Sequence, residues 1–238
     1  MFEIPEVIGQ YKFIKRINRY TGVVSKQSTT ETVFIANTGK LTELLVKDAP
    51  AYIKEGEKNP KRKTQYDLLA IEHGKTIVCI DTRVPNWIFE DQLKNNEIKE
   101  LEGFEIKKRE YKIANSKFDY YLENEGEKCL AELKLCTLVQ NQKMFFPDAV
   151  SARSSKHLND LVSARKQGYR TIVYFVGLRG DPTSFGPNKE LDPAFNEAFE
   201  HALKESVEIL AVKTSIKYEN QNLIFSEFES VPIKTEED

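Results

Sequence analysis

Cysteine is scarce in this chain, and the few that occur do not form a pattern. Cys79, Cys129 and Cys136 are odd in number, and each lies in an apolar, strand-like run. The chain has no CxxC motif and no Cys/His cluster, so neither a disulfide framework nor a zinc site is indicated. This usage is typical of buried, reduced thiols, and we expect a cytoplasmic protein.

Long apolar runs and a surplus of charge of one sign are also lacking. No run approaches the roughly 18 residues that a membrane span requires, so we expect no membrane partner. The first five residues have no basic segment leading into an apolar stretch, and we expect no secretory leader. Because the net charge is only -2, any nucleic-acid-binding surface must be a local basic patch.

The 238 residues, of which 40% are hydrophobic, are enough for one large domain or two modest ones. The first part of the chain reads as short, β-rich runs separated by turns. Strands of this length at close spacing are typical of a small barrel, and we expect an OB-like barrel of five strands. The expected strands are residues 11–17, 32–35, 51–53, 67–72 and 76–80.

The pattern changes at Pro85, which stops the last of these strands, and Asn86 can cap a helix over 87–95. Three strands, a helix, a strand buried on both faces, a second helix and a further strand follow. They are expected at residues 104–113, 117–122, 129–138, 154–167, 171–176, 193–204 and 207–212. The order predicts an α/β (α+β) protein whose barrel domain, 1–82, precedes a mixed sheet flanked by helices, 83–238.

Three polar residues interrupt two of the expected strands. Glu132 and Lys134 lie two residues apart in an apolar run, so their side chains point to the same side of a strand. Asp119 lies on the adjoining strand, which a hairpin-type loop connects, and we expect its carboxylate within a few ångströms of Glu132. Two converging carboxylates suit a hard cation such as Mg²⁺ or Mn²⁺, which can activate water against a phosphodiester.

In this interpretation Asp119 and Glu132 hold the metal, and Lys134 positions the attacking water and the scissile phosphate. The alternative for the same pattern is an ordinary strand with a surface salt bridge. The apolar neighbours on both strands and the order of the elements favour the metal site.

This arrangement resembles the PD-(D/E)xK nuclease superfamily, whose core also runs helix, three strands, helix, strand. In that superfamily the first helix often adds an acidic residue. The resemblance therefore implies Glu90 and Asp91 as further metal ligands.

From about residue 12 to residue 212 the chain also resembles the sugar fermentation stimulation protein A (SfsA) family. The resemblance implies an OB-like N-terminal domain, a restriction-endonuclease-like C-terminal domain of the PD-(D/E)xK type, and DNA binding. Three departures, Leu135 in place of the usual Asn, Lys117 in place of Arg and Ser151 in place of Thr, leave the metal ligands intact. The resemblance is carried by Asn37-Thr38-Gly39, residues 59–64, Pro85-Asn86, Asp119, Glu132-Leu133-Lys134, residues 146–150, Arg153, Lys156-His157-Leu158 and Asp192-Pro193.

Basic residues gather in three places that suit a phosphate backbone. Two clusters lie in the barrel, where basic and aromatic residues alternate as they do on OB-fold surfaces that bind nucleic acid. The third opens the helix after the site strand, where backbone N–H groups favour anions. Ordinary solvated charge is the alternative for all three. The candidates are Lys12, Lys15, Arg16 and Arg19; Lys61, Arg62 and Lys63; and Arg153, Lys156 and His157.

Three functions remain open from the sequence. The first is a DNA-binding protein with an Mg²⁺-dependent phosphodiesterase site acting on single- or double-stranded DNA. Such a protein could act as a homodimer. The second is a non-catalytic DNA-binding regulator of sugar metabolism genes on a nuclease-like fold. The third is an enzyme or binder directed at RNA. The intact acid pair favours the enzyme, because a buried acid pair without metal is costly.

Overall fold

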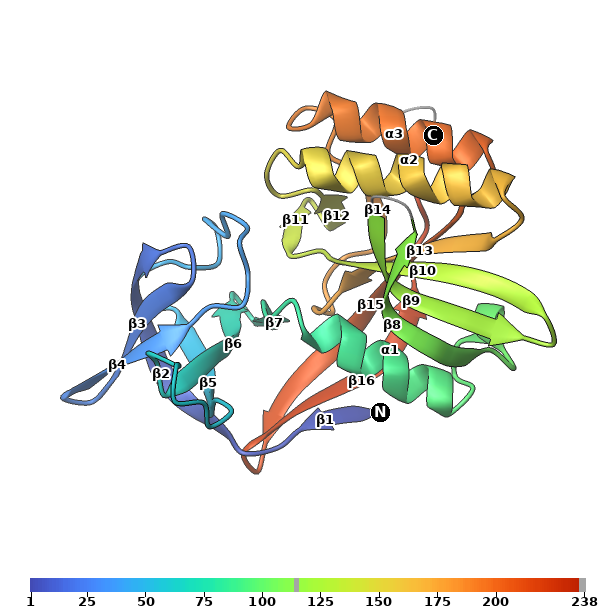
Figure 1. The fold of residues 1–238 in the computed structure, drawn as a ribbon. Coiled ribbons are helices and arrows are strands. Elements are labelled where there is room, and N and C mark those ends of the chain that lie inside the picture. Colours follow the sequence, from blue (N-terminus) through green and yellow to red (C-terminus); the bar gives the residue numbers. More distant parts are fainter. Residues whose placement is uncertain (114–115, 236–238) are drawn as a thin grey trace.

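The computed structural model describes residues 1–113 and 116–235, and its N-terminal part is a barrel (Figure 1). The strand order is β4-β3-β2-β5-β6-β7, and a parallel pairing of β4 with β6 closes the barrel. The OB-like barrel that the sequence predicts is therefore confirmed. Its strands are β2 (Val7–Asn18), β3 (Thr21–Lys26), β4 (Thr29–Phe34), β5 (Pro50–Glu55), β6 (Tyr66–His73) and β7 (Thr76–Cys79).

The second part of the chain is built on a seven-stranded sheet in the order β1-β16-β15-β13-β10-β9-β8. The three strands β10, β13 and β15 run parallel, and the outer strands pair antiparallel. The strands are β1 (Phe2–Ile4), β8 (Glu105–Ile113), β9 (Ser116–Asn124), β10 (Glu127–Leu135), β13 (Arg170–Gly177), β15 (Glu208–Glu219) and β16 (Asn222–Ser230).

Helices cover both faces of this sheet (Figure 1). Helix α1 (Val84–Lys94) packs on one face, and helices α2 (Ala152–Lys166) and α3 (Pro193–Lys204) pack on the other. Helix α1 begins earlier than the sequence indicates, because Pro85 is accommodated in its first turn, where its missing N–H has no partner to lose. The mixed sheet flanked by helices is thus confirmed.

Smaller elements complete the larger domain. Strands β11 (Leu138–Gln140), β12 (Lys143–Phe146) and β14 (Ser184–Pro187) form a separate three-stranded sheet, and a short 3₁₀ helix, η1 (Lys99–Leu101), follows α1. All three cysteines are free and buried, as expected. Within the described residues no helix combines the length and apolarity needed to cross a bilayer.

The two halves of the chain are connected through more than one linker. Strand β1 pairs with β16, so the first residues lie in the larger sheet although the barrel follows them. Barrel residues Tyr52, Leu69 and Cys79 also belong to the apolar core beneath α1. The division of the chain at residue 82 stays a prediction, and β1 departs from it because it completes the edge of the larger sheet.

Candidate active site

The predicted site lies where β9 and β10 separate. The two strands pair from their hairpin up to Tyr120 opposite Ala131, and Asp119 and Glu132 occupy the next position on each strand. Here the two carboxylates replace the backbone hydrogen bonds between the strands. Leu133 N–H donates to Asp119 Oδ2 at 2.8 Å, and Asp119 N–H donates to Glu132 Oε2 at 3.3 Å. The structure thus brings the two acids together and fixes both against the backbone.

Glu132 is the centre of a buried cluster on the face that α2 covers. Its side chain is only 3% exposed, and Oε1 accepts hydrogen bonds from Lys134 Nζ and from His157 Nδ1, each at 2.5 Å. Strand alternation places Glu132 and Lys134 on this face, as the sequence predicts. His157 reaches them from α2, and its ring packs edge-on against Phe118 at 6.1 Å.

The two carboxylates differ in their electrostatic surroundings. Burial and the neighbouring charge of Glu132 raise the pKa of Asp119 to about 6. Burial also acts to raise the pKa of Glu132, but the hydrogen bond from His157 and the charge of Lys134 outweigh it, so that this pKa is lowered. Near neutral pH both groups are therefore ionised side by side, which is the state that a cation requires.

The free oxygen of Asp119 suits a divalent cation with a partly hydrated shell. Among the described residues, Asp119 Oδ1 accepts no hydrogen bond, whereas Oδ2 holds Leu133 N–H. The same part of the chain gathers no group of three or more His, Cys, Asp and Glu side chains around one metal position. Two carboxylates, completed by waters, are a common ligand set for Mg²⁺, so the residues fit the group.

The structure does not bring Glu90 and Asp91 into this site, and here it differs from the expectation. Glu90 accepts hydrogen bonds from Arg109 Nε and Nη2 at 2.5 and 2.6 Å and from the Tyr120 hydroxyl at 2.9 Å. The hydrogen bond from Arg109 lowers the pKa of Glu90 although burial opposes it. The physical reason is the fold: α1 packs on one face of the sheet, and Glu132 faces the other.

The three anion ligands predicted at the start of α2 have different surroundings. Arg153 is exposed and forms no ion pair with any described residue. Lys156 Nζ donates to Ser116 Oγ and Asp160 Oδ2, each at 2.5 Å, so its charge is partly engaged. His157 turns inward to Glu132. His157 shares one helix face with Ser154, Leu158 and Leu161. This spacing is the sequence signal that could have indicated that its side chain points inward.

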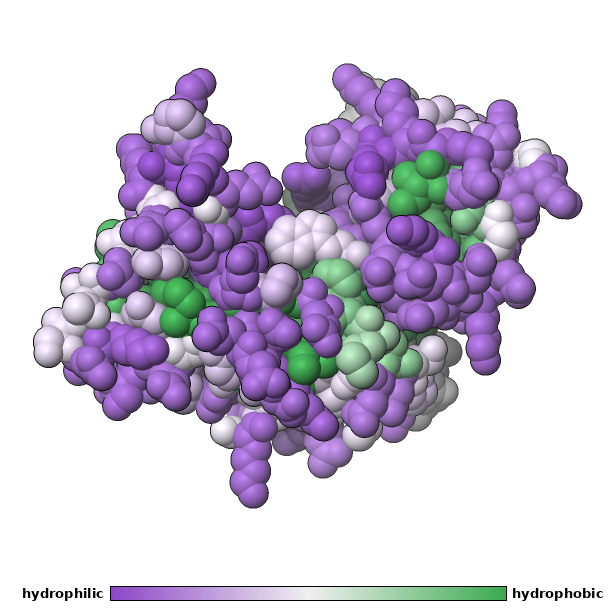
Figure 2. Space-filling view, turned by 90° about the horizontal axis from the view of Figure 1, so that it is seen from below, coloured by the Kyte–Doolittle hydropathy of each residue, from purple (hydrophilic) through white to green (hydrophobic). Residues whose placement is uncertain are grey.

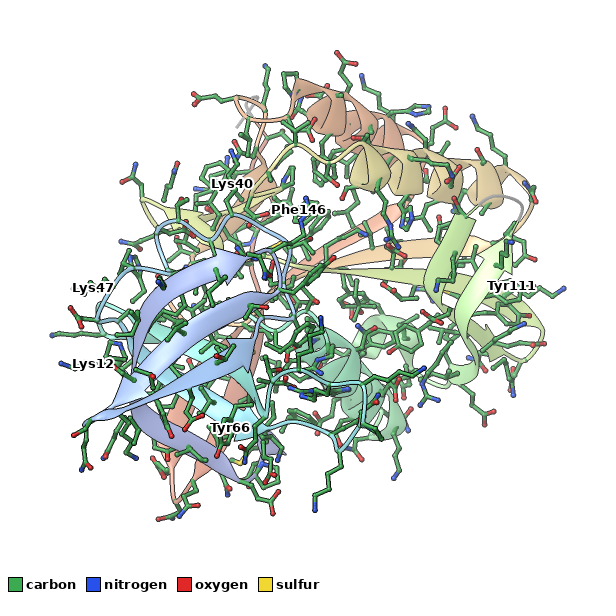
Figure 3. The ribbon with its side chains drawn as sticks, turned by 60° about the vertical axis from the view of Figure 1, so that its left-hand side comes forward. Lys12, Lys40, Lys47, Tyr66, Tyr111 and Phe146 are labelled. Carbon is green, nitrogen blue, oxygen red and sulfur yellow. The ribbon has the colours of Figure 1, made fainter. Side chains whose placement is uncertain are left out.

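Some basic residues of the barrel are held by hydrogen bonds within it, and others are exposed to solvent. The guanidinium of Arg16 donates to the carbonyl oxygens of Arg19, Asn37 and Gly39, each at 2.6 Å, and so fixes two loops. Arg62 bonds Asp67 and the Thr64 carbonyl. Lys12 lies on the outer side of the barrel, away from α2 (Figure 3). Four others are exposed, without an ion pair to the described residues: Lys15, Arg19, Lys61 and Lys63.

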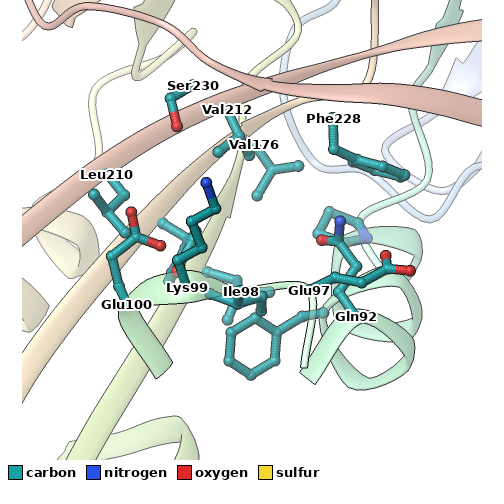
Figure 4. A pocket seen from close by; sticks show the side chains of 14 residues that line it. Gln92, Glu97, Ile98, Lys99, Glu100, Val176, Leu210, Val212, Phe228 and Ser230 are labelled. Carbon is teal, nitrogen blue, oxygen red and sulfur yellow. The ribbon is translucent and has the colours of Figure 1, made fainter. Parts of the chain in front are cut away.

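A cavity of about 250 Å³ lies on the opposite face of the sheet, between α1, η1 and the central strands. Figure 4 shows Lys99 and Glu100 on its rim, facing Val176, Val212 and Leu210. It approaches the site only through Leu133, whose side chain points away from Glu132. The acid pair therefore lies outside this cavity.

Comparison with known proteins agrees with this architecture. The model of the SfsA N-terminal OB domain matches residues 14–80, and that of the sugar fermentation stimulation protein RE domain matches residues 83–220. A sugar fermentation stimulation protein homolog of Moorella thermoacetica is 33% identical over 217 residues, covering 91% of this chain and 94% of that protein. One of Caldanaerobacter subterraneus subsp. tengcongensis is 38% identical over 208 residues, covering 87% and 90%.

A solved structure of similar fold is that of Pyrococcus furiosus SfsA in complex with Ca²⁺. It matches with a TM-score of 0.90 and 28% identity and covers 98% of both chains.

Proposed function

The chain belongs to the sugar fermentation stimulation protein (SfsA) family, and from this and its site we propose that it binds DNA and hydrolyses phosphodiester bonds with a divalent cation at Asp119 and Glu132. The observation that carries the proposal is the acid pair where β9 and β10 separate, with Lys134 beside it. Each acid accepts one backbone N–H, but this role alone does not require two adjacent charges among apolar residues.

Each side chain has a role that follows from its contacts. Asp119 and Glu132 hold the cation, Mg²⁺ or Mn²⁺, which when bound supplies Lewis-acid assistance to phosphodiester cleavage. Lys134 places its ammonium beside Glu132 Oε1, where it orients the attacking water and pairs with a phosphate oxygen. His157 holds the Glu132 carboxylate in one orientation and touches no substrate.

The Ca²⁺ bound by the Pyrococcus furiosus protein supports a cation site of this type in the present chain. Ca²⁺ and Mg²⁺ both prefer oxygen ligands. Asp119 Oδ1 and the waters that would complete the shell supply oxygen only.

DNA contacts are assigned to the exposed basic residues. Arg153 at the start of α2 suits a phosphate next to the site, because the N-terminus of a helix favours anions. The barrel contributes a second set of cations that can follow the backbone. The barrel set comprises Lys12, Lys15, Arg19, Lys61 and Lys63, whereas Arg16 and Arg62 position its loops.

A non-catalytic DNA-binding regulator is the second candidate, and one observation favours it. Glu132 Oε1 is already satisfied by Lys134 and His157, so the buried charge is compensated without a metal. In that case the cluster would serve the stability of the sheet.

Cleavage of labelled single- and double-stranded DNA with Mg²⁺ or Mn²⁺ separates the two candidates. The wild-type chain should cut, and Glu132→Ala and Lys134→Ala should lose cutting while they still bind DNA. Glu123→Ala is the matched control, because this acid lies on β9 outside the site and its side chain accepts a hydrogen bond from the Tyr121 hydroxyl at 3.2 Å. Wild-type protein that binds DNA but never cuts it with either cation would favour the regulator.

A further inference from the structure

A row of rings and guanidinium groups leads from the barrel to the first helix of the larger domain. The ring of Tyr20 stacks on Phe34, with centroids 6.2 Å apart and planes inclined by 15°. The guanidinium of Arg83 lies over Phe34 at 5.9 Å and over Trp87 at 5.6 Å. Arg62 lies over Phe34 at 5.8 Å. We call these five residues the aromatic–arginine row.

Buried carboxylates hold the two guanidinium groups of the row in place. Arg83 donates to Asp67 Oδ2 at 2.7 Å and to Asp81 Oδ1 at 2.9 Å, and Arg62 also pairs with Asp67. Asp67 and Asp81 are 6% and 0% exposed. Because these acids neutralise both cations and fix their planes, neither guanidinium is available as a phosphate ligand. The row therefore offers a partner a flat, polarisable surface and no free charge.

The ends of the row are open to solvent. Tyr20 is 48% exposed and Trp87 is 41% exposed, which is unusual for rings of this size in a chain with three apolar cores. Packing does not account for this exposure, because the barrel and α1 leave a large part of each ring uncovered. In the view from below, pale and green patches interrupt the hydrophilic surface across both domains (Figure 2).

Unpaired cations lie next to this flat surface. Lys61 and Lys63 line a hollow of about 390 Å³ together with Phe34 and Arg62. Neither lysine forms an ion pair within residues 1–113 and 116–235. The hollow therefore combines the ring of Phe34 with two exposed ammonium groups. This combination complements a strand whose bases are unstacked and whose phosphates lie alongside.

We propose that the aromatic–arginine row binds unstacked bases of single-stranded DNA. The inference rests on the proposed DNA binding and deepens it, because it names the single-stranded part of the substrate. In a duplex the base faces are covered by their neighbours, so that exposed rings have nothing to stack on. A single strand presents each base face to Tyr20 and Trp87, with Arg62 and Arg83 extending the stacking surface between them.

The protein carries its own reporter for this contact, because Trp87 is the only tryptophan in the chain. The full chain is titrated in EDTA, where no cleavage occurs, with a single-stranded oligonucleotide of about 12 nucleotides. The same titration is made with a fully abasic strand and with a duplex of equal length. We expect the base-bearing single strand alone to quench Trp87 fluorescence strongly. Equal quenching by the abasic strand or by the duplex overturns the proposal, as does the absence of quenching by the single strand.

Variants test the row independently of the reporter. In fluorescence anisotropy with a labelled single strand, Trp87→Ala and Tyr20→Ala should each raise Kd about tenfold, and Trp87→Phe should raise it less. Leu203→Ala is the matched control, because Leu203 is 39% exposed on α3, away from the row, and its Kd should not change. An unchanged Kd for both alanine variants of the row overturns the proposal.

The outcome is distinguishable from that of the proposed function. If metal-dependent cutting occurs but Trp87 does not respond to single strands, only the stacking surface is wrong. If Trp87 responds and the variants weaken binding but no cutting is found, the surface stands and the enzyme proposal falls.

Discussion

Asp119 lies beside Glu132, and its charged form is less favourable in the folded protein than in the unfolded chain. Burial and the charge of Glu132 raise the pKa of Asp119 to about 6, so at pH 7.5 the folded protein carries a charge that the unfolded chain solvates better. Asp119→Asn keeps an oxygen for Leu133 N–H and removes the charge. We expect the metal-free variant to melt about 2–4 °C higher than the wild type, which corresponds to roughly 1 kcal/mol.

The same variant should lose stabilisation by Mg²⁺, because stabilisation by a ligand requires the site that binds it. Differential scanning fluorimetry with and without Mg²⁺ measures both effects in one experiment. A variant that melts below the wild type in EDTA would mean that the Asp119 charge stabilises the fold.

Cation affinity should depend on pH through the same group. Since the pKa of Asp119 in the folded, metal-free protein is about 6, the carboxyl is protonated below that pH and must release its proton to bind a cation. The effect on stability has the opposite sign: because the folded pKa is the higher one, the metal-free protein gains stability from this group as pH falls through 6.

Calorimetric titration with Mn²⁺ at pH 7.5, 6 and 5 measures the affinity. We expect little change down to pH 6.5 and an approach to about tenfold loss per pH unit below 6. Asp119→Asn should show no measurable Mn²⁺ binding at any of the three pH values, and a wild-type affinity that is flat between pH 7.5 and 5 would contradict the assignment of Asp119 as a ligand.

His157 lies in surroundings that the sequence did not predict. A histidine at the start of a helix after a basic stretch is typical of an exposed anion ligand, and only the packing of α2 on the sheet turns it towards Glu132. Asp119, Glu132 and Lys134, by contrast, were predictable, because strand alternation and a short hairpin determine which side chains meet.

A supporting hydrogen bond to a metal ligand commonly contributes a factor of about 10 to 100 to activity or metal affinity. We therefore expect His157→Ala to lower kcat or Mn²⁺ affinity by such a factor while the Kd for DNA stays within about twofold. His157→Gln retains a donor and should recover part of the loss. If both variants instead weaken DNA binding and leave metal affinity unchanged, His157 is a DNA contact after all.

At the scale of elements, the helices and central strands of the larger sheet were predictable and some short strands were not. The apolar run of β13 and the cap of α3 at Asp192 determine local structure by themselves. Strand β14, Ser184–Pro187, contains Gly and Pro and lacks apolar alternation, so that only its pairing with β12 makes it a strand. Strand β3 was hidden because Tyr20-Thr21-Gly22 resembles a turn.

The barrel loop with Asn37-Thr38-Gly39 meets the segment after β12 at a close approach. A Cβ on Gly39 would overlap the carboxylate of Asp148, and Arg16 Nη1 holds the Gly39 carbonyl at 2.6 Å, so the loop is not free to retreat. Gly39→Ala should therefore destabilise the protein by about 1–3 kcal/mol in urea unfolding.

The double variant Gly39→Ala/Asp148→Ala removes the overlapping carboxylate and should recover part of that loss. Thr38→Ala, at an exposed position of the same loop, serves as the control and should change stability by less than about 0.5 kcal/mol. If the double variant is less stable by the full sum of the single effects, the two residues do not interact.

At the scale of the whole molecule, the barrel and the nuclease-like domain share packing. The ring of Tyr52 on β5 lies 4.9 Å from that of Tyr218 on β15, and Cys79 N–H on β7 donates to the Leu178 carbonyl at 3.0 Å. These contacts could not be read from the sequence, because periodicity reports which residues are buried and not which partner buries them. A boundary drawn between β7 and α1 divides the topology but cuts through a continuous core.

The shared core leads to a prediction about cooperativity. Since residues of both halves bury one another, the full chain should unfold in a single calorimetric transition, with van't Hoff and calorimetric enthalpies that agree within error. Removing residues 1–5 deletes β1 and its pairing with β16, including the contact of Phe2 with Phe225 at 5.9 Å, and should lower Tm by several degrees without splitting the transition. Met1→Ala, at an exposed position before β1, should leave Tm unchanged. Two resolved transitions in the full chain would mean that the barrel and the nuclease-like domain fold independently, and that the contacts through Tyr52 and Cys79 contribute little to stability.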